Sequence, residues 1–573
     1  MKCNDYSRIV HRRFHGHMGN SEKSREPLGW HFKLDDGDFH EIHNTDGLHE
    51  YVRGPYSFVD CISSPKNAKR LNVAWGLDFP AALLFRHFSK DQLRRMIITG
   101  TMNVSGAKVR YLPGKFISIR KRGTRIELYD ISQFFPRMTM REALLKYVPI
   151  GGNIADLAGW LQGSLSSVGI HTNKLYSPAN VAQRLMMHEC EVPNMYRKKA
   201  KEYAYKTYSG GRIEVFKRGF IPHVQMWDIA SAYPAEIRNL LDVQNGEWDF
   251  KRDYDPSAAY AFIRAEVLID GETGLIPYRK PDGTLYYPSG KWHEAHITDK
   301  ELHAIEDSGG TVNILDAWHF YPTLLNHPFR SLIDRLYSLR REIEKEDRNR
   351  ANTIKLLMNS LSGKFLQLNT AWQIADWQEM EDFLECTDDI IGVKRIFTTG
   401  RMFNPVYAAI ITANVRLKLR KSVVSERDLI AFHTDGLMTL SPPREDSVGD
   451  GMGTFRLKET GDAIVMGSGI YEIESDDGSR TTRTRSFNPD GKSLRDILAS
   501  QGRSAKLKLP VVRPITLNEL FNRDDFTPSA IAETVHEEME ISAGFDYKRR
   551  WFTFPRCSDF LDSCMESEVL RVK

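Results

Sequence analysis

Two aspartates of this chain have the setting that phosphoryl chemistry requires. Asp228 ends a short run, residues 224–227, that favours a β-strand, and the residues after it have helical periodicity. Asp435 lies in the tight turn between two strand-like runs, residues 429–432 and 437–440. Both carboxylates are therefore expected to be exposed where strands end.

Two carboxylates at the ends of neighbouring strands can hold two divalent ions about 3.5–4 Å apart, the arrangement used to transfer a nucleotidyl group. Oxygen ligands with positions left for water and phosphate favour Mg²⁺, and Mn²⁺ can substitute. Each aspartate alone has a plainer interpretation. Asp228 could cap the helix that follows it, and Asp435 could be an ordinary turn residue.

Between the two aspartates, a pair of helices is predicted to form an arm. Residues 329–346 carry an apolar stripe with helical spacing, and a second helix follows. On the second helix Lys355 and Asn359 are four residues apart and share a face. Lys355 would meet a triphosphate as a point charge, and Arg340 or Arg341 on the first helix could add a guanidinium fork. A solvated charged face is the alternative.

The three segments resemble motifs A, B and C of family B DNA polymerases, in particular the protein-primed viral and linear-plasmid branch. They read DIASAYP at 228–234, KLLMNSLSG at 355–363 and HTDG at 433–436. The resemblance implies that Tyr233 excludes ribose 2′-hydroxyls. It assigns the metal ligands to Asp228, Asp435 and the backbone carbonyl of Ile229, and the nucleotide ligands to Tyr233, Arg340, Lys355 and Asn359.

Two further segments follow the order of the same family. Residues 208–211, YSGG, resemble the linker that touches template, and residues 412–416, TANVR, resemble a primer-terminus element. Taken alone, the first is a glycine turn and the second an ordinary helix turn. The DNA-binding residues implied by the resemblance are Tyr208, Gly210, Gly211, Thr412, Arg416, Thr434 and Tyr471.

The chain also departs from the family pattern at three places. His433 stands where the family has an aspartate, which predicts altered metal preference or altered handling of the primer terminus. Ser362 replaces a tyrosine that lies against the nascent base pair, which predicts lower fidelity. Residues 469–471, GIY, occupy the place of a Lys-x-Tyr primer element and lack its lysine.

By the same resemblance, the residues before the polymerase motifs form a 3′–5′ exonuclease domain, which needs four carboxylates. Asp60, residues 76–80 and Asp156 are the nearest matches, with Glu127 and Asp130 as alternatives. A two-metal site cannot be assembled from that set. We therefore predict a degenerate exonuclease fold without proofreading, retained as a platform for single-stranded template.

The expected fold is α/β and multidomain, a right-hand polymerase with palm, fingers and thumb behind an N-terminal ribonuclease H-like domain. A chain of 573 residues is too long for one core. The predicted parts are an exonuclease-like domain (1–205), palm (206–248 and 405–472), two insertions resembling terminal-protein regions (249–327 and 366–404), fingers (328–365) and thumb (473–573).

Composition adds little about partners. The formal net charge is +4, which alone does not indicate a nucleic-acid binder, although basic clusters such as 198–206 suit phosphate contacts. The six cysteines form no C-x-x-C pair, and neither a signal peptide nor a membrane span is evident. We expect an intracellular protein, in the host cytoplasm if viral.

These features predict a template-directed DNA polymerase that adds dNMPs to a primer 3′-hydroxyl, with primer-template DNA, dNTPs and a terminal protein primer as partners. Two alternatives remain open. One is a primer-independent or terminal-type nucleotidyltransferase, and the other is a non-catalytic DNA-binding subunit with a polymerase fold.

Overall fold

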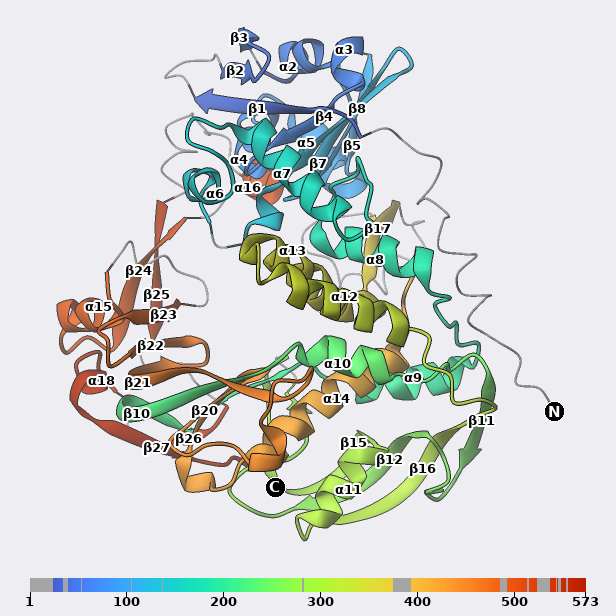
Figure 1. Cartoon of the computed structure of the whole chain (residues 1–573), viewed down its shortest axis with the longest axis vertical. Coiled ribbons are helices and arrows are strands. Elements are labelled where there is room, and N and C mark those ends of the chain that lie inside the picture. The colour runs from blue at the N-terminus through green and yellow to red at the C-terminus, as the bar shows by residue number, and fades with distance from the viewer. Residues whose placement is uncertain are drawn as a thin grey trace.

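A computed structural model gives the fold of the chain (Figure 1). It describes residues 24–34, 40–52, 54–104, 106–136, 138–280, 283–374, 393–484, 492–512, 515–522, 536–542, 544, 548–552 and 555–572. Residues 1–23 lie outside the described part of the chain.

An eight-stranded sheet organises the N-terminal part of the chain (Figure 1). Its strand order is β3 (His49–Val52), β2 (His40–Asn44), β1 (Pro27–Leu34), β4 (Leu71–Ala74), β8 (Thr124–Asp130), β7 (Phe116–Lys121), β6 (Ala107–Leu112) and β5 (Thr101–Val104). The strand β4 is fully buried, and it pairs in parallel with both β1 and β8. Burial on both faces is typical of a central parallel strand.

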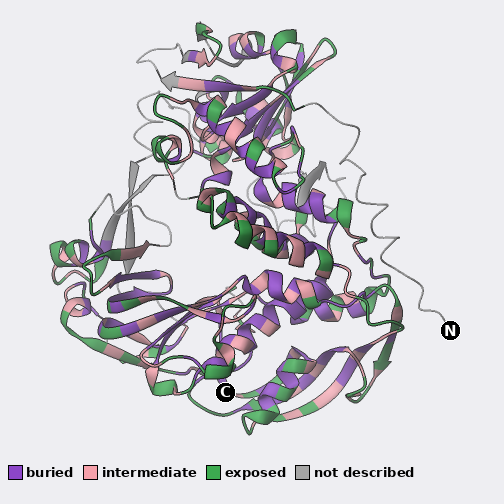
Figure 2. Cartoon of the chain, viewed as in Figure 1, coloured by how far each residue is buried: buried purple, intermediate pink, exposed green. Residues whose placement is uncertain are grey.

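A second sheet lies below the first in Figure 1 and carries both aspartates. Its main path is β23 (Arg480–Thr484), β22 (Ile470–Glu474), β21 (Phe455–Gly467), β10 (Lys217–Ile229), β20 (Gly436–Thr439), β19 (Leu429–Thr434) and β9 (Arg212–Val215). The helix α14 (Pro405–Ser422) packs Val415 and Leu419 onto this sheet. That helix is buried along most of its length (Figure 2).

The predicted arm consists of α12 (Arg330–Ile343) and α13 (Arg348–Asn359), which lie side by side between the two sheets (Figure 1). Leu332, Ile333 and Leu336 of α12 are buried, in agreement with the apolar stripe. Asp347 ends the connection between the helices and caps α13, because its carboxylate accepts hydrogen bonds from two backbone N–H groups of the first turn.

Two insertions interrupt the second sheet in sequence. The first builds a five-stranded sheet from β11 (Gly246–Lys251), β16 (Thr311–Pro322), β12 (Tyr260–Ile269), β15 (Ser289–Thr298) and β28 (Arg571–Val572), with α11 (Asp299–Asp307) packed against it. The second contains a hairpin of β17 (Leu368–Ile374) and β18 (Val393–Thr399). The tip of that hairpin, residues 375–392, lies outside the described residues.

The C-terminal residues 473–573 contribute to several parts of the structure. Leu507, in the hairpin of β24 (Lys506–Val512) and β25 (His536–Ser542), packs with α15 (Leu494–Gln501) and α18 (Asp559–Asp562), whereas α16 (Leu517–Asn522) packs against the N-terminal core. The strand β27 (Cys564–Glu568) pairs with β10, and β28 joins the insertion sheet. The chain end thus completes the edges of other sheets, which residue patterns do not predict.

No helix in the described residues is long and apolar enough to cross a membrane.

Candidate functional site

The fold brings Asp228 and Asp435 together. Asp228 lies at the end of β10 and pairs in register with Gly436, the first residue of β20. Asp435 occupies the turn between β19 and β20, where Thr434 has a positive φ of 66°. The N–H of Ile229 donates to the carbonyl of Asp435 at 2.9 Å, so the two segments are tied by their backbones.

Gly436 makes room for the first carboxylate. A Cβ at this position would lie 2.9 Å from Oδ1 of Asp228 and 2.8 Å from Cε of Met226. Both contacts are shorter than ordinary van der Waals distances. Gly436 is therefore part of the local packing around Asp228.

The electrostatics of the pair favour a cation between the two carboxylates. Burial, and then the charge of Asp228, raise the pKa of Asp435 to about 6. Lys355 and Lys458 act in the opposite direction on this carboxyl. Two carboxylates that repel each other in a partly buried place are a fitting donor set for a divalent ion, which would relieve the repulsion.

Lys458 is the residue of the site that the sequence did not reveal. Its Nζ lies 2.6 Å from Oδ2 of Asp228. Lys458 belongs to none of the recognised segments and comes from β21, so only the pairing of β10 with β21 places it here.

His433 is neutral in this setting, because burial lowers its pKa to about 4. Its ring lies against Tyr471 of β22, with 4.9 Å between ring centroids, and its Nε2 has no hydrogen-bond partner among the described residues. Tyr471 is only 6% exposed and packs against His433, and its expected contact with DNA stays a prediction. Across the described residues, no group of three or more His, Cys, Asp or Glu side chains is arranged to hold a metal ion.

The arm helices face the aspartates. Lys355 and Asn359 are exposed on α13, and the charge of Lys355 acts on Asp435. Arg340 of α12 reaches Ser231, with 3.4 Å between Nη1 and Oγ. Ser231 precedes α10 (Ala232–Asn239) and has a positive φ of 52°, so the chain turns sharply soon after Asp228. Three of the four predicted nucleotide ligands thus come from the arm.

A pocket of about 500 Å³ joins the remaining segments. Its lining includes Tyr208, Gly211, Tyr233, Ser362, Gly363 and Thr412. A Cβ on Gly211 would lie 2.7 Å from the hydroxyl of Tyr233 and 2.8 Å from Cγ2 of Thr434, so the linker needs glycine to approach this closely. Burial raises the pKa of Tyr233, which keeps its phenol protonated.

Arg416 is not among the residues that line this pocket. It is 1% exposed and donates to the backbone carbonyls of Ser209 and Gly210 and, at 2.8 Å, to Glu301 of α11. Thr412 donates its hydroxyl to Ala408 within α14. Arg416 therefore ties the linker to α14 and α11, and its contact with DNA stays a prediction.

The acidic residues considered for a second metal site in the N-terminal part are dispersed over separate elements. Asp60 is exposed on α2 (Gly54–Ile62) and pairs with Lys121. Asp156 belongs to the capping box that begins α7 (Ile154–Ser166). Asp78 accepts a hydrogen bond from the hydroxyl of Tyr111 at 2.6 Å.

The two alternatives on β8 have structural partners as well. Glu127 accepts hydrogen bonds from the hydroxyls of Tyr129 and Tyr176 at 2.7 and 2.8 Å. Asp130 is buried and accepts hydrogen bonds from the backbone N–H groups of Gly76 and Leu77. Each carboxylate thus has a local role in the fold.

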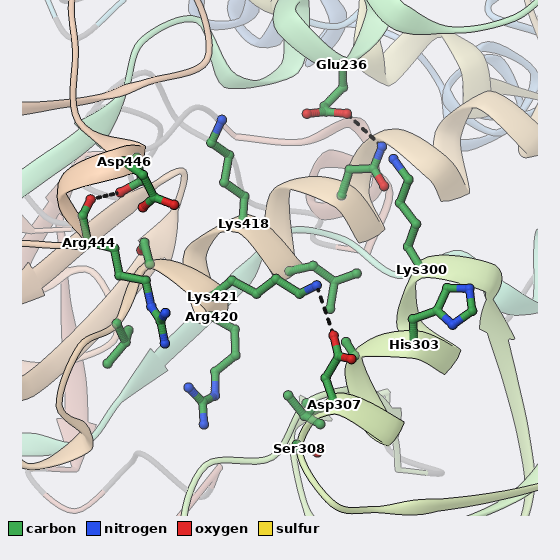
Figure 3. A pocket seen from close by; sticks show the side chains of 17 residues that line it. Glu236, Lys300, His303, Asp307, Ser308, Lys418, Arg420, Lys421, Arg444 and Asp446 are labelled. Atoms are coloured by element: carbon green, nitrogen blue, oxygen red, sulfur yellow. Dashed lines mark hydrogen bonds and ion pairs between the residues drawn. The ribbon is translucent and has the colours of Figure 1, made fainter.

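A larger cavity, about 830 Å³, lies away from the aspartates between α11 and the C-terminal half of α14 (Figure 3). Its basic side chains include Lys418, Arg420 and Lys421, and Lys421 pairs with Asp307 at 3.6 Å. Basic residues near a helix C-terminus complement the helix dipole, which accounts for Arg420 and Lys421 here.

The fold, with its aspartates between an arm of two helices and a buried sheet, is that of a right-hand polymerase with an N-terminal exonuclease-type domain. It superposes on Phi29 DNA polymerase complexed with primer-template DNA (TM-score 0.58, 15% identity, 86% of this chain and 98% of that one). The superposition on Phi29 DNA polymerase complexed with single-stranded DNA is similar (TM-score 0.60, 14% identity, 86% and 98%).

Sequence comparison finds similarity to DNA polymerases over part of the chain. Residues 164–399 match the family of DNA polymerase type B, organellar and viral. A DNA polymerase of Acidianus bottle-shaped virus (isolate Italy/Pozzuoli) is 22% identical over 330 residues, which cover 53% of this chain and 44% of the relative. The match thus spans less than half the length of that curated relative. Together with the fold, these matches show that the chain is similar to family B DNA polymerases of the viral type.

Proposed function

We propose that this protein is a template-directed DNA polymerase that adds dNMPs to a primer 3′-hydroxyl in viral or plasmid replication. The observation that carries the proposal is the meeting of Asp228 and Asp435 in front of Lys355. A module that only binds DNA has no use for two adjacent carboxylates that repel each other.

Each residue has a task in this mechanism. Asp228 and Asp435 would hold two Mg²⁺ ions, and Mn²⁺ can replace Mg²⁺. When bound, one ion would activate the primer hydroxyl and the other would carry the triphosphate. Lys355 and Arg340 neutralise the phosphates of the incoming nucleotide and of the departing pyrophosphate. Tyr233 lines the pocket beside Gly211, and its ring would exclude the 2′-hydroxyl of a ribonucleotide.

Extension of a 5′-labelled primer on a longer template, with four dNTPs and Mg²⁺, tests the proposal. Wild type should give template-length products and Asp435→Asn none, with DNA affinity retained in both. Asp428→Asn, at the opposite end of β19, is the matched control and should extend like wild type. Extension by Asp435→Asn would refute the site assignment.

The proposal includes the absence of 3′–5′ proofreading. The central strands β1, with sequence PLGWHFKL, and β4, with LNVA, carry no acidic residue. The nearby carboxylates have structural partners, as described above. Incubation of the protein with a labelled single strand and Mn²⁺ should leave the strand intact, and stepwise shortening would contradict this part.

The likeness to protein-primed polymerases extends the proposal to a terminal protein as primer. Initiation assays with a candidate terminal protein and a single labelled dNTP would test it, because a protein-linked nucleotide is the expected product. Products in reactions that lack template or primer would instead favour a terminal-type transferase.

A further inference from the structure

The ion pair between Lys458 and Asp228 is built into the strand pairing. Opposite β10, Met226 pairs with Glu459 and Trp227 pairs with Leu457, so Lys458 has no opposite residue and forms a β-bulge. A bulge re-aims a side chain and is common beside active sites. Because of this bulge, the consecutive residues Leu457 and Lys458 are both exposed, and the ammonium of Lys458 points to the carboxylate of Asp228.

The charge of Lys458 extends over the whole site. Besides its contact with Asp228, it acts on Asp435 and on His433. The side chains of Lys458 and Asp228 remain 42% and 37% exposed, so the pair is open to exchange with solutes. An exposed ion pair of this kind contributes little to the free energy of unfolding. We therefore infer that the bulge serves the site rather than the stability of the sheet.

Two departures from the family pattern make such a lysine useful. His433 is neutral and removes one carboxylate, and residues 469–471 lack the lysine of the primer-binding element. Tyr471 is buried under His433 and offers no charge in its place. Lys458 is the cation that this chain does place at the end of β10.

We propose that Lys458 is a positioning residue that holds Asp228 when no divalent ion is bound, is displaced from it by that ion, and then binds the phosphodiester at the primer terminus. This inference rests on the proposed function. The exchange is non-covalent: Asp228 replaces one cationic partner by another, and the ammonium replaces a carboxylate by a phosphate. Lys458 thus couples occupation of the metal site to binding of the primer terminus.

Mn²⁺ binding to the free protein, followed by electron paramagnetic resonance without DNA or nucleotide, tests the first half. Lys458→Met should bind Mn²⁺ about three- to tenfold more tightly than wild type, since the competing ammonium is gone. Lys217→Met breaks a comparable ion pair, with Glu566 at 2.7 Å, at the far end of β10 and should leave the affinity unchanged. In an Asp228→Asn background, Lys458→Met should have no effect. Equal Mn²⁺ affinity of wild type and Lys458→Met would overturn the competition.

A primer with a neutral methylphosphonate at its last internucleotide linkage tests the second half. Wild type should bind this primer about tenfold more weakly than an ordinary primer, because a charge-assisted contact is lost. Lys458→Met should bind both primers equally, and Lys458→Arg should recover part of the discrimination. Equal discrimination by wild type and Lys458→Met would refute the phosphate contact.

Both measurements are binding assays and do not depend on turnover. If wild type extends no primer but Lys458→Met still binds Mn²⁺ more tightly, the proposed function fails and the ion exchange stands. If wild type extends primers and neither assay responds to Lys458→Met, the inference about Lys458 fails and the proposed function stands.

Discussion

Replacement of Asp435 by asparagine should stabilise the protein in the absence of divalent ions, although it should abolish extension. The amide side chain would keep nearly the shape of the carboxylate and remove a charge that burial and Asp228 disfavour. Functional sites often store such repulsion, because the ligand that relieves it is present during the reaction.

The size of the effect follows from the pKa of Asp435, about 6 against an ordinary value of 3.8. That difference corresponds to about 3 kcal/mol at neutral pH. Because the pKa is raised, the folded state binds the proton more readily than the unfolded state between pH of about 4 and 6. The free energy of unfolding of wild type therefore falls as pH rises through this window and stays low above it.

Thermal unfolding in EDTA, followed by circular dichroism from pH 4 to 8, measures the difference in stability between wild type and Asp435→Asn. At pH 7.5 Asp435→Asn should melt higher than wild type by on the order of 5–10 °C, if the palm sheet unfolds as a unit of about 200 residues. The difference should vanish towards pH 4. Asp428→Asn serves as the control for loss of a charge on the same hairpin.

Addition of Mg²⁺ should raise the melting temperature of wild type and leave Asp435→Asn nearly unchanged. An Asp435→Asn variant that melts at or below the wild-type temperature in EDTA at pH 7.5 would refute the reasoning. The two carboxylates would then not repel each other in the folded protein.

Three further substitutions probe the site. Gly436→Ser places Cβ 2.9 Å from Oδ1 of Asp228, so single-nucleotide incorporation should slow by about 10- to 100-fold. An unchanged rate would show that the carboxylate can move freely. Ser362→Tyr adds a stacking surface to the pocket and should lower the KM for dNTP about tenfold and reduce misincorporation. Steady-state kinetics measures both quantities. No change in either would show that residue 362 does not lie against the nascent base pair. Arg416→Met leaves buried Glu301 without its arginine partner and should lower the free energy of unfolding, measured by urea denaturation, by about 3–5 kcal/mol. A loss below about 1 kcal/mol would contradict a structural role.

The sequence predicted the elements that depend on short stretches of chain. The strand before Asp228, the turn at Asp435 and the two arm helices are all found, because alternation, helical spacing and turn residues act locally. The order of these segments led to the fold class, which the superposition on Phi29 DNA polymerase confirms. The roles of the site residues remain predictions for the experiments above.

The residues that only the tertiary structure revealed are those whose neighbours are distant in sequence. Lys458 reaches Asp228 through a one-residue bulge in the pairing of two strands. The alternation of polar and apolar residues along a strand does not predict where such a bulge lies. Arg416 lies in a motif-like helix turn, and only the tertiary structure shows that it is buried against Glu301 and contacts the linker. Asp60 lies on the helix α2, and its partner Lys121 comes from a strand 61 residues further along the chain.

The same reason explains the end of the chain. Residues 473–573 look like one domain because they are contiguous, but sheet edges are completed by whichever strands can pair with them. Local propensity therefore determined the elements of this protein and the identity of its two central carboxylates. Long-range strand pairing and burial decided which charges meet those carboxylates, and that outcome depends on packing free energies that a linear pattern does not contain.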